Sequence, residues 1–175
     1  ASVVLLLFSL GIYSRALQHD FVWDDEGILV EDQEIRELSN IPSFFVTPLV
    51  LGDDDTPEEA DSVDSGNVRY YRPLLSTLHT IEYRWFGLNP LGYKIINLLL
   101  NGAVVLCAFL LVRALTGETL LAFLAAFLYA ANPARGEVVY WIYSDSHLFA
   151  ALFFLLALLA YHRGRTALAL VGVAV

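Results

Sequence analysis

The sequence predicts an all-α polytopic membrane protein, a bundle of transmembrane helices interrupted by one long polar loop. Two observations predict this fold class. Of the 175 residues, 57% are hydrophobic, yet the formal net charge is -9, a combination that average globular composition does not produce. Sixteen of the nineteen acidic residues lie between Asp20 and Glu82, with only three of the ten basic residues. Apolar and acidic residues are therefore segregated, as expected for a membrane protein with a single polar insertion.

Apolar runs define the predicted membrane spans. The uncharged run 95–112 has eighteen residues, enough to cross about 30 Å of hydrocarbon at about 1.5 Å per residue. Similar patterns, bounded by charges and by the "NP" at 132 and 133, define the other segments. We expect spans at 1–17, 91–115, 118–134 and 146–162 and the start of a fifth at 166–175. The chain contains no Met and begins and ends inside apolar runs, so we expect it to be incomplete.

Basic residues in the short loops predict the orientation of these spans. Arg113 closes the second span and "HRGR" closes the fourth, which places both ends on the cytoplasmic side by the positive-inside rule. The loop 18–90 and the connection "NPARGEVVYWIYSD" then face the extracytoplasmic side together. We therefore expect an integral, multi-pass protein of the prokaryotic inner membrane or the endoplasmic reticulum.

The long loop contains two different kinds of segment. Residues 51–67 carry turn formers and like charges without periodicity, which predicts a solvated flexible segment. A calcium site is the alternative, but the spacing does not match the EF-hand pattern. Residues 72–87 have apolar positions at 74, 75, 78, 81 and 85, a helical spacing that suits a helix lying along the membrane surface.

The stretch "FVWDDEGI" directly follows the first predicted span and carries the candidate catalytic residues, Asp24 and Asp25. Two adjacent carboxylates in a partly dehydrated corner repel each other, so one of them can have a raised pKa and act as a general base. The alternative is a structural role, since Asp is common at helix starts and turns.

Three further charged residues are candidates for the same site. Arg72 is either a surface charge or an anion clamp, because the planar guanidinium binds two phosphate oxygens at once. Glu137 and Asp145 border the third and fourth predicted spans, and carboxylates at membrane depth are functional candidates by default.

Other polar residues are expected to have structural roles. Asn97 and Asn101 lie four residues apart on one helical face, which favours interhelical hydrogen bonds. His79 and His147 are interpreted as satisfied polar residues, and the single Cys107 has no zinc-site spacing. We therefore predict no protein-bound metal site.

The order of these motifs resembles that of a known enzyme superfamily. "FVWDDEGILVEDQEI", then "YYRPLLSTLHTIEYRWFGLNPLGYKIINLLL", then "NPARGEVVYWIYSDSHLFAALFFLLALLAY" resembles the front part of the GT-C glycosyltransferases. It is most similar to the multi-spanning O-mannosyltransferases that carry tetratricopeptide repeats, and to their prokaryotic relatives. The resemblance covers nearly the whole chain apart from the acidic segment. It implies the N-terminal part of a GT-C transmembrane bundle whose first extracytoplasmic loop carries interfacial helices.

The resemblance also implies an activity. Such enzymes move a sugar from a polyprenyl-phosphate-linked donor to a hydroxyl of a protein or glycan, on the extracytoplasmic side, with inversion. Asp24, with Asp25 as neighbour or alternative, matches the first-loop acidic motif that supplies the base, and Arg72 matches the arginine that helps to hold the donor phosphate. Glu137 and Asp145 match acidic positions near the later spans. A divalent cation is compatible with this chemistry, and the implied partners are membrane lipid, donor and acceptor, with no nucleic acid.

The chain departs from that pattern at positions where family members carry histidine. It has Asn101 at one of them, and it reads "NPARGE" from Asn132 where an "HP" and a further histidine are expected. These departures leave open a rival interpretation, in which the chain is a non-catalytic subunit or scaffold of a larger membrane complex. A transporter is the third interpretation, because intramembrane acids also serve proton relays.

Overall fold

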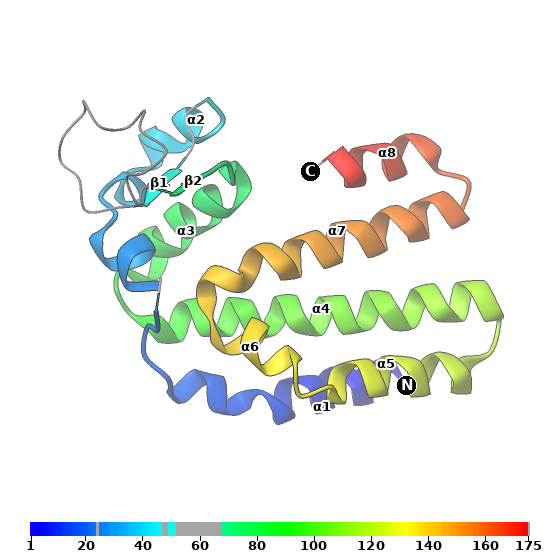
Figure 1. Ribbon diagram of the computed structural model, residues 1–175. Coiled ribbons are helices and arrows are strands. Elements are labelled where there is room, and N and C mark those ends of the chain that lie inside the picture. Colours follow the sequence, from blue (N-terminus) through cyan, green and yellow to red (C-terminus); the bar gives the residue numbers. More distant parts are fainter. Residues whose placement is uncertain (24, 47–48, 52–67, 175) are drawn as a thin grey trace. The chain divides into compact units, whose positions relative to one another are not determined.

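The computed structural model of the chain describes residues 1–23, 25–46, 49–51 and 68–174 (Figure 1). These residues form two compact units: the bundle unit, Ala1–Phe21 with Pro90–Val175, and the loop unit, Val22–Asn89. Asp24 lies outside the described residues. The predicted flexible or calcium-binding segment 51–67 also lies outside them, apart from Leu51. The helical content of both units confirms the all-α fold class.

The bundle unit consists of helices joined by short turns. Its elements are α1 (Ser2–Ile12), a 3₁₀ turn (Ser14–Gln18), α4 (Pro90–Thr116), α5 (Thr119–Ala131), α6 (Arg135–Tyr140), a second 3₁₀ turn (Ile142–Ser144), α7 (Asp145–His162) and α8 (Thr166–Ala174). Gly117 after α4 has φ 74° and Gly164 after α7 has φ 71°. Because glycine adopts this left-handed conformation without a Cβ clash, both residues end their helices.

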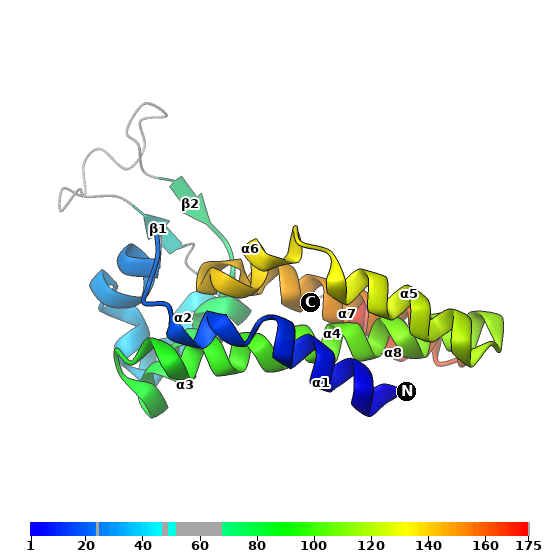
Figure 2. The ribbon, with the colours of Figure 1, turned by 90° about the horizontal axis from the view of Figure 1, so that it is seen from below.

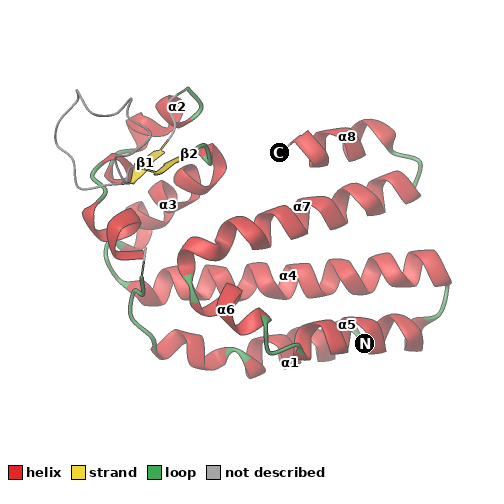
Figure 3. Cartoon of the chain, viewed as in Figure 1, coloured by secondary structure: helices red, strands yellow, loops and turns green. Residues whose placement is uncertain are grey.

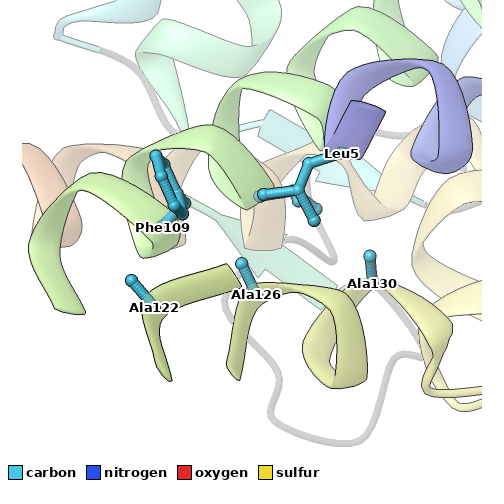
Figure 4. Packing of buried hydrophobic residues seen from close by; sticks show 6 residues of the cluster. Leu5, Phe109, Ala122, Ala126 and Ala130 are labelled. Carbon is cyan, nitrogen blue, oxygen red and sulfur yellow. The ribbon is translucent and has the colours of Figure 1, made fainter. Parts of the chain in front are cut away.

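Helix α4 is the central element of the bundle unit. It packs against α1, α5 and α7, and α7 packs in turn against α8 (Figures 1 and 2). Small residues on α5 allow close contact: Ala122, Ala126 and Ala130, four residues apart, face Leu5 of α1 and Phe109 of α4 (Figure 4). Small side chains at this spacing let helix backbones approach closely, which is how helices associate where lipid replaces water.

Two helical segments of the described chain are long and apolar enough to cross a membrane. They are Pro90–Thr116 and Ile142–His162, while Ser2–Gln18 and Thr119–Ala131 are shorter apolar helices. The predicted arrangement of four spans with the start of a fifth, and their orientation, therefore remain predictions.

The loop unit combines short turns with one longer helix. Its elements are a π-helical turn (Glu26–Glu31), 3₁₀ turns (Glu34–Arg36 and Leu38–Asn40), α2 (Ile41–Phe44), strands β1 (Leu49–Leu51) and β2 (Val68–Tyr70), and α3 (Pro73–Phe86). The strands pair antiparallel, with Leu49 opposite Tyr70 (Figure 3). This short pair was not predicted from the sequence, whereas α3 occupies the predicted helical segment 72–87.

Candidate functional site

The acidic motif of the loop unit has an unusual backbone. Trp23 has φ 52°, a left-handed conformation that costs a residue with a Cβ about 1–3 kcal/mol. The main chain closes a turn here, since the N–H of Asp25 donates to the carbonyl of Val22 at 3.1 Å. The carboxylate oxygen Oδ2 of Asp25 accepts the N–H of Val22, also at 3.1 Å. Asp25 therefore fixes the turn that carries the motif.

Asp25 is fully buried, whereas Trp23 is 73% exposed. The π-helical turn Glu26–Glu31 starts immediately after Asp25. Such turns are rare and often mark functional sites, as strained backbone does. Of the two predicted carboxylates only Asp25 can be located, so the assignment of Asp24 as the base remains a prediction.

Arg72 stands at the start of α3, where its half-buried side chain precedes the helix. Its carbonyl accepts the N–H of Ser76 at 3.1 Å, and Pro73 occupies the first turn, where a missing N–H is harmless. The helix start therefore fixes the backbone of Arg72. Its role as a phosphate clamp remains a prediction.

The buried face of α3 is mostly polar. Its buried residues are Leu75, Ser76, His79, Thr80 and Glu82. Of the predicted apolar positions, Leu75 is buried, whereas Leu74 is 37% and Trp85 71% exposed. This helix therefore buries four polar residues on one side, unlike a typical helix on the surface of a soluble protein. An open apolar face is what contact with lipid requires.

His79 and Glu82 form a buried pair on α3. His79 Nδ1 lies 2.9 Å from Glu82 Oε2, and both side chains are at most 1% exposed. Burial raises the pKa of Glu82 above its ordinary value, and the hydrogen bond from His79 partly offsets this. Glu82 Oε1 is buried without a hydrogen-bond partner among the described residues. The pair can hold a proton closer to neutral pH than a free glutamate can.

From the sequence, His79 is interpreted as a satisfied polar residue, and Glu82 is not among the candidate site residues. The hydrogen bond gives Nδ1 of His79 a partner, and the interpretation of His79 as a satisfied residue and not a metal ligand remains a prediction. The signal that could have identified the pair is the spacing of three residues, which places both side chains on one face of a helix.

In the bundle unit, the chain between α5 and α7 lacks continuous helix. Helix α5 has 13 residues, about 20 Å at 1.5 Å per residue, shorter than the roughly 30 Å of a bilayer core. It is followed by the short α6 and a 3₁₀ turn before α7 begins. Such backbone is tolerated at membrane depth only where protein groups satisfy its carbonyls.

Three polar side chains, two from α4 and one from the chain that follows α1, satisfy these carbonyls. The Tyr13 hydroxyl lies 2.9 Å from the carbonyl oxygen of Ala130 and 3.0 Å from that of Asn132. The Lys94 ammonium donates to the carbonyl of Tyr140, and Asn97 Nδ2 donates to that of Val139 at 3.2 Å. A cation at the C-terminal end of α6 also favours the helix dipole. The segment is therefore held by α4 and by the chain that follows α1.

Asn101 confirms the interhelical hydrogen bonding predicted for the two asparagines of α4, because its Nδ2 donates to Ser9 Oγ of α1 at 3.0 Å. Its Oδ1 accepts a hydrogen bond from Arg135. Arg135 was not among the candidate site residues predicted from the sequence.

The two acidic candidates of the bundle unit differ in burial. Glu137 lies on α6 and is exposed, whereas Asp145 is the first residue of α7 and is fully buried. A carboxylate in the first helical turn favours the helix dipole. Asp25 and Arg72 belong to the loop unit, and Glu137 and Asp145 to the bundle unit. A single site containing all of them remains a prediction.

Several curated proteins are similar to this chain. Protein O-mannosyl-transferase TMTC2 of Mus musculus is 30% identical over 168 residues, covering 92% of the chain and 18% of the relative. Protein O-mannosyl-transferase Tmtc1 of Drosophila melanogaster is 29% identical over 157 residues, covering 87% of the chain and 17% of the relative. Protein O-mannosyl-transferase TMTC3 of Homo sapiens is 26% identical over 153 residues, covering 87% of the chain and 16% of the relative.

The chain thus spans less than a quarter of the length of these relatives, with shares of 16 to 18%. No protein-family model matches the chain. No solved structure matches it either.

Proposed function

We propose that this chain carries the catalytic loop of a membrane glycosyltransferase of the GT-C type. Over about nine-tenths of its length, the chain is similar to the N-terminal part of the protein O-mannosyl-transferases TMTC1 to TMTC4. The donor is a sugar linked to a polyprenyl phosphate, and the acceptor is a hydroxyl group, with a protein serine or threonine as the first candidate. The reaction takes place on the extracytoplasmic side.

One observation carries the proposal: the acidic motif directly after the first apolar helix has a buried carboxylate in a strained turn. Asp25 is fully buried and Trp23 has φ 52°. Strained backbone and buried carboxylates occur together where a catalytic group must be held in one geometry. A purely structural loop would relax the strain by placing glycine at this position.

In the proposed reaction Asp24 takes the proton of the attacking hydroxyl. The hydroxyl oxygen bonds to the anomeric carbon while the bond from that carbon to the lipid phosphate breaks on the opposite face, which inverts the configuration. The lipid phosphate leaves with the electron pair, and Arg72 stabilises its charge by a forked hydrogen bond. The base contributes about 10²- to 10⁴-fold to the rate.

Asp25 has a different part in this proposal. Its side chain accepts the N–H of Val22 at 3.1 Å, so it holds the turn and adds negative charge beside Asp24. Neighbouring negative charge makes a carboxylate a stronger base. Glu137 and Asp145 remain candidates for acceptor or donor contacts in the bundle unit.

The test uses the full-length protein in detergent and a polyprenyl-phosphate mannose donor. Asp24→Asn should reduce turnover by about 10²- to 10⁴-fold, with donor binding largely retained, because the amide cannot accept a proton at neutral pH. Asp25→Asn should reduce it less. The matched control is Asp20→Asn, since Asp20 is exposed and lies outside the motif. If Asp24→Asn and Asp25→Asn both transfer mannose at the parent rate, the catalytic assignment of this motif is wrong. If the parent protein itself transfers no mannose, the scaffold interpretation is favoured.

A further inference from the structure

Arg135 is a charged residue for which the described chain supplies no opposite charge. It is the first residue of α6, and the ion pair identified among the described residues, His79 with Glu82, does not involve it. Its Nε is buried and has no hydrogen-bond partner among the described residues. Unpaired cations are costly at membrane depth, and those that occur there are functional candidates.

The guanidinium is nevertheless held in one place. Its carbon Cζ lies 4.1 Å from the ring centroid of Tyr129, close enough for a cation–π interaction. Nη2 donates to Oδ1 of Asn101. Asn101 is itself oriented, because its Nδ2 donates to Ser9 Oγ at 3.0 Å and both residues are fully buried. The side chain is therefore fixed by neutral partners on two sides.

Arg135 is also accessible from outside the bundle. The side chain is only half-buried, and the preceding residues 132–134 are exposed. The nearest acid in the sequence, Glu137, is exposed on the same helix and can point into water without pairing. Asn101 uses only one N–H of a group that has five, so a forked contact to an anion remains geometrically available.

We propose that Arg135 binds the phosphate group of a membrane lipid at the end of the bundle where α5 and α6 meet. A phosphate supplies the missing negative charge and acceptor oxygens, and guanidinium binds it with two parallel hydrogen bonds. The phosphate belongs either to a bulk phospholipid or to a polyprenyl phosphate, and only the second assignment rests on the proposed glycosyltransferase function. If Arg135 served only to hold α6 against α4, its charge would not require a bound anion.

The experiment measures lipid binding by the full-length protein in neutral detergent, by isothermal titration calorimetry. The probes are farnesyl phosphate, farnesol, which has the same chain without the phosphate, and phosphatidylglycerol. Arg135→Gln should weaken farnesyl phosphate binding at least about tenfold, equivalent to about 1.4 kcal/mol, and leave farnesol binding unchanged. Arg135→Lys, which keeps the charge but loses the fork, should give an intermediate affinity.

The matched control is Arg113→Gln, since Arg113 is an exposed arginine in the last turn of α4, and this variant should bind farnesyl phosphate as the parent does. Equal affinity of Arg135→Gln and parent for farnesyl phosphate would overturn the proposal. Equal loss of farnesol and farnesyl phosphate binding would also overturn it, because that result indicates a structural role.

Phosphatidylglycerol distinguishes the two sources of phosphate. Arg135-dependent binding of farnesyl phosphate that phosphatidylglycerol cannot displace supports a polyprenyl phosphate ligand, whereas equal competition supports a phospholipid headgroup. Because no sugar is transferred in this assay, a protein without transferase activity can still pass it. The failure of this inference and that of the proposed function are therefore separable.

Discussion

The two units use buried polar side chains in different ways. In the bundle unit, Lys94, Asn97 and Tyr13 bind main-chain carbonyls of the segment between α5 and α7. In the loop unit, His79 and Glu82 on α3 bind each other. The difference follows from the surroundings. An interrupted helix in an apolar bundle leaves carbonyls that water cannot reach, whereas α3 is continuous and satisfies its own backbone.

This comparison suggests different sensitivities in the two units. A side chain that caps a carbonyl leaves a buried acceptor unsatisfied when it is removed, and that penalty is not recovered elsewhere. A pair of titratable side chains, in contrast, can change its protonation state. The bundle unit should therefore respond mainly to deletion of polar groups, and the loop unit mainly to pH.

The largest expected effect is that of Lys94→Met. This variant keeps the length of the side chain but removes the donor to the carbonyl of Tyr140, so the protein should lose about 1.5–3 kcal/mol of stability, the range for hydrogen bonds to charged groups. Thermal unfolding in detergent measures it. Arg113→Met, at the exposed end of the same helix, is the control and should change little. Equal effects of both variants would contradict the capping role of Lys94.

A smaller effect is expected for Tyr13→Phe, which deletes one hydroxyl and keeps the ring. The carbonyls of Ala130 and Asn132 lose a neutral donor, so stability should fall by about 0.5–1.5 kcal/mol. The same unfolding measurement applies, with Tyr161→Phe as the control because Tyr161 is 67% exposed. An unchanged unfolding temperature for Tyr13→Phe would mean that the carbonyls find other donors.

The smallest expected effect is a pH dependence of the stability of the folded protein, and it arises from Glu82. Burial raises its pKa in the folded protein, so the folded state holds the proton more tightly than the unfolded state does. This contribution to stability is complete below the ordinary glutamate pKa of about 4.3 and is lost as the pH rises through the raised value. Relative to Glu82→Gln, which does not titrate, the parent should therefore become less stable as the pH increases.

Unfolding of parent and Glu82→Gln between about pH 4.5 and 7.5 tests the sign of this effect. Glu31→Gln is the matched control, because it makes the same substitution at an exposed residue. If the parent instead gains stability over Glu82→Gln as the pH rises, the ion pair with His79 outweighs the burial of Glu82. The loop unit would then depend on a charge pair and not on a retained proton.

The local pattern of the sequence was sufficient for the helical fold class and for most helix positions. The apolar runs correspond to α1, α4, α5, α7 and α8, and the segment starting with Pro73 is α3. The interhelical hydrogen bond of Asn101 was also predicted correctly. These predictions succeed because hydropathy and helix periodicity are set by a few neighbouring residues.

Only the tertiary structure decided which polar groups meet. Tyr13 and Ala130 are 117 residues apart in the sequence, and Arg135 and Asn101 are 34 apart, so no local pattern relates them. The side of α3 that carries His79 and Glu82 is buried, which the spacing of its apolar residues alone does not specify. The physical reason is that a side chain's hydrogen-bond partner is set by helix packing, whereas the sequence by itself determines only where helices form and which residues they present.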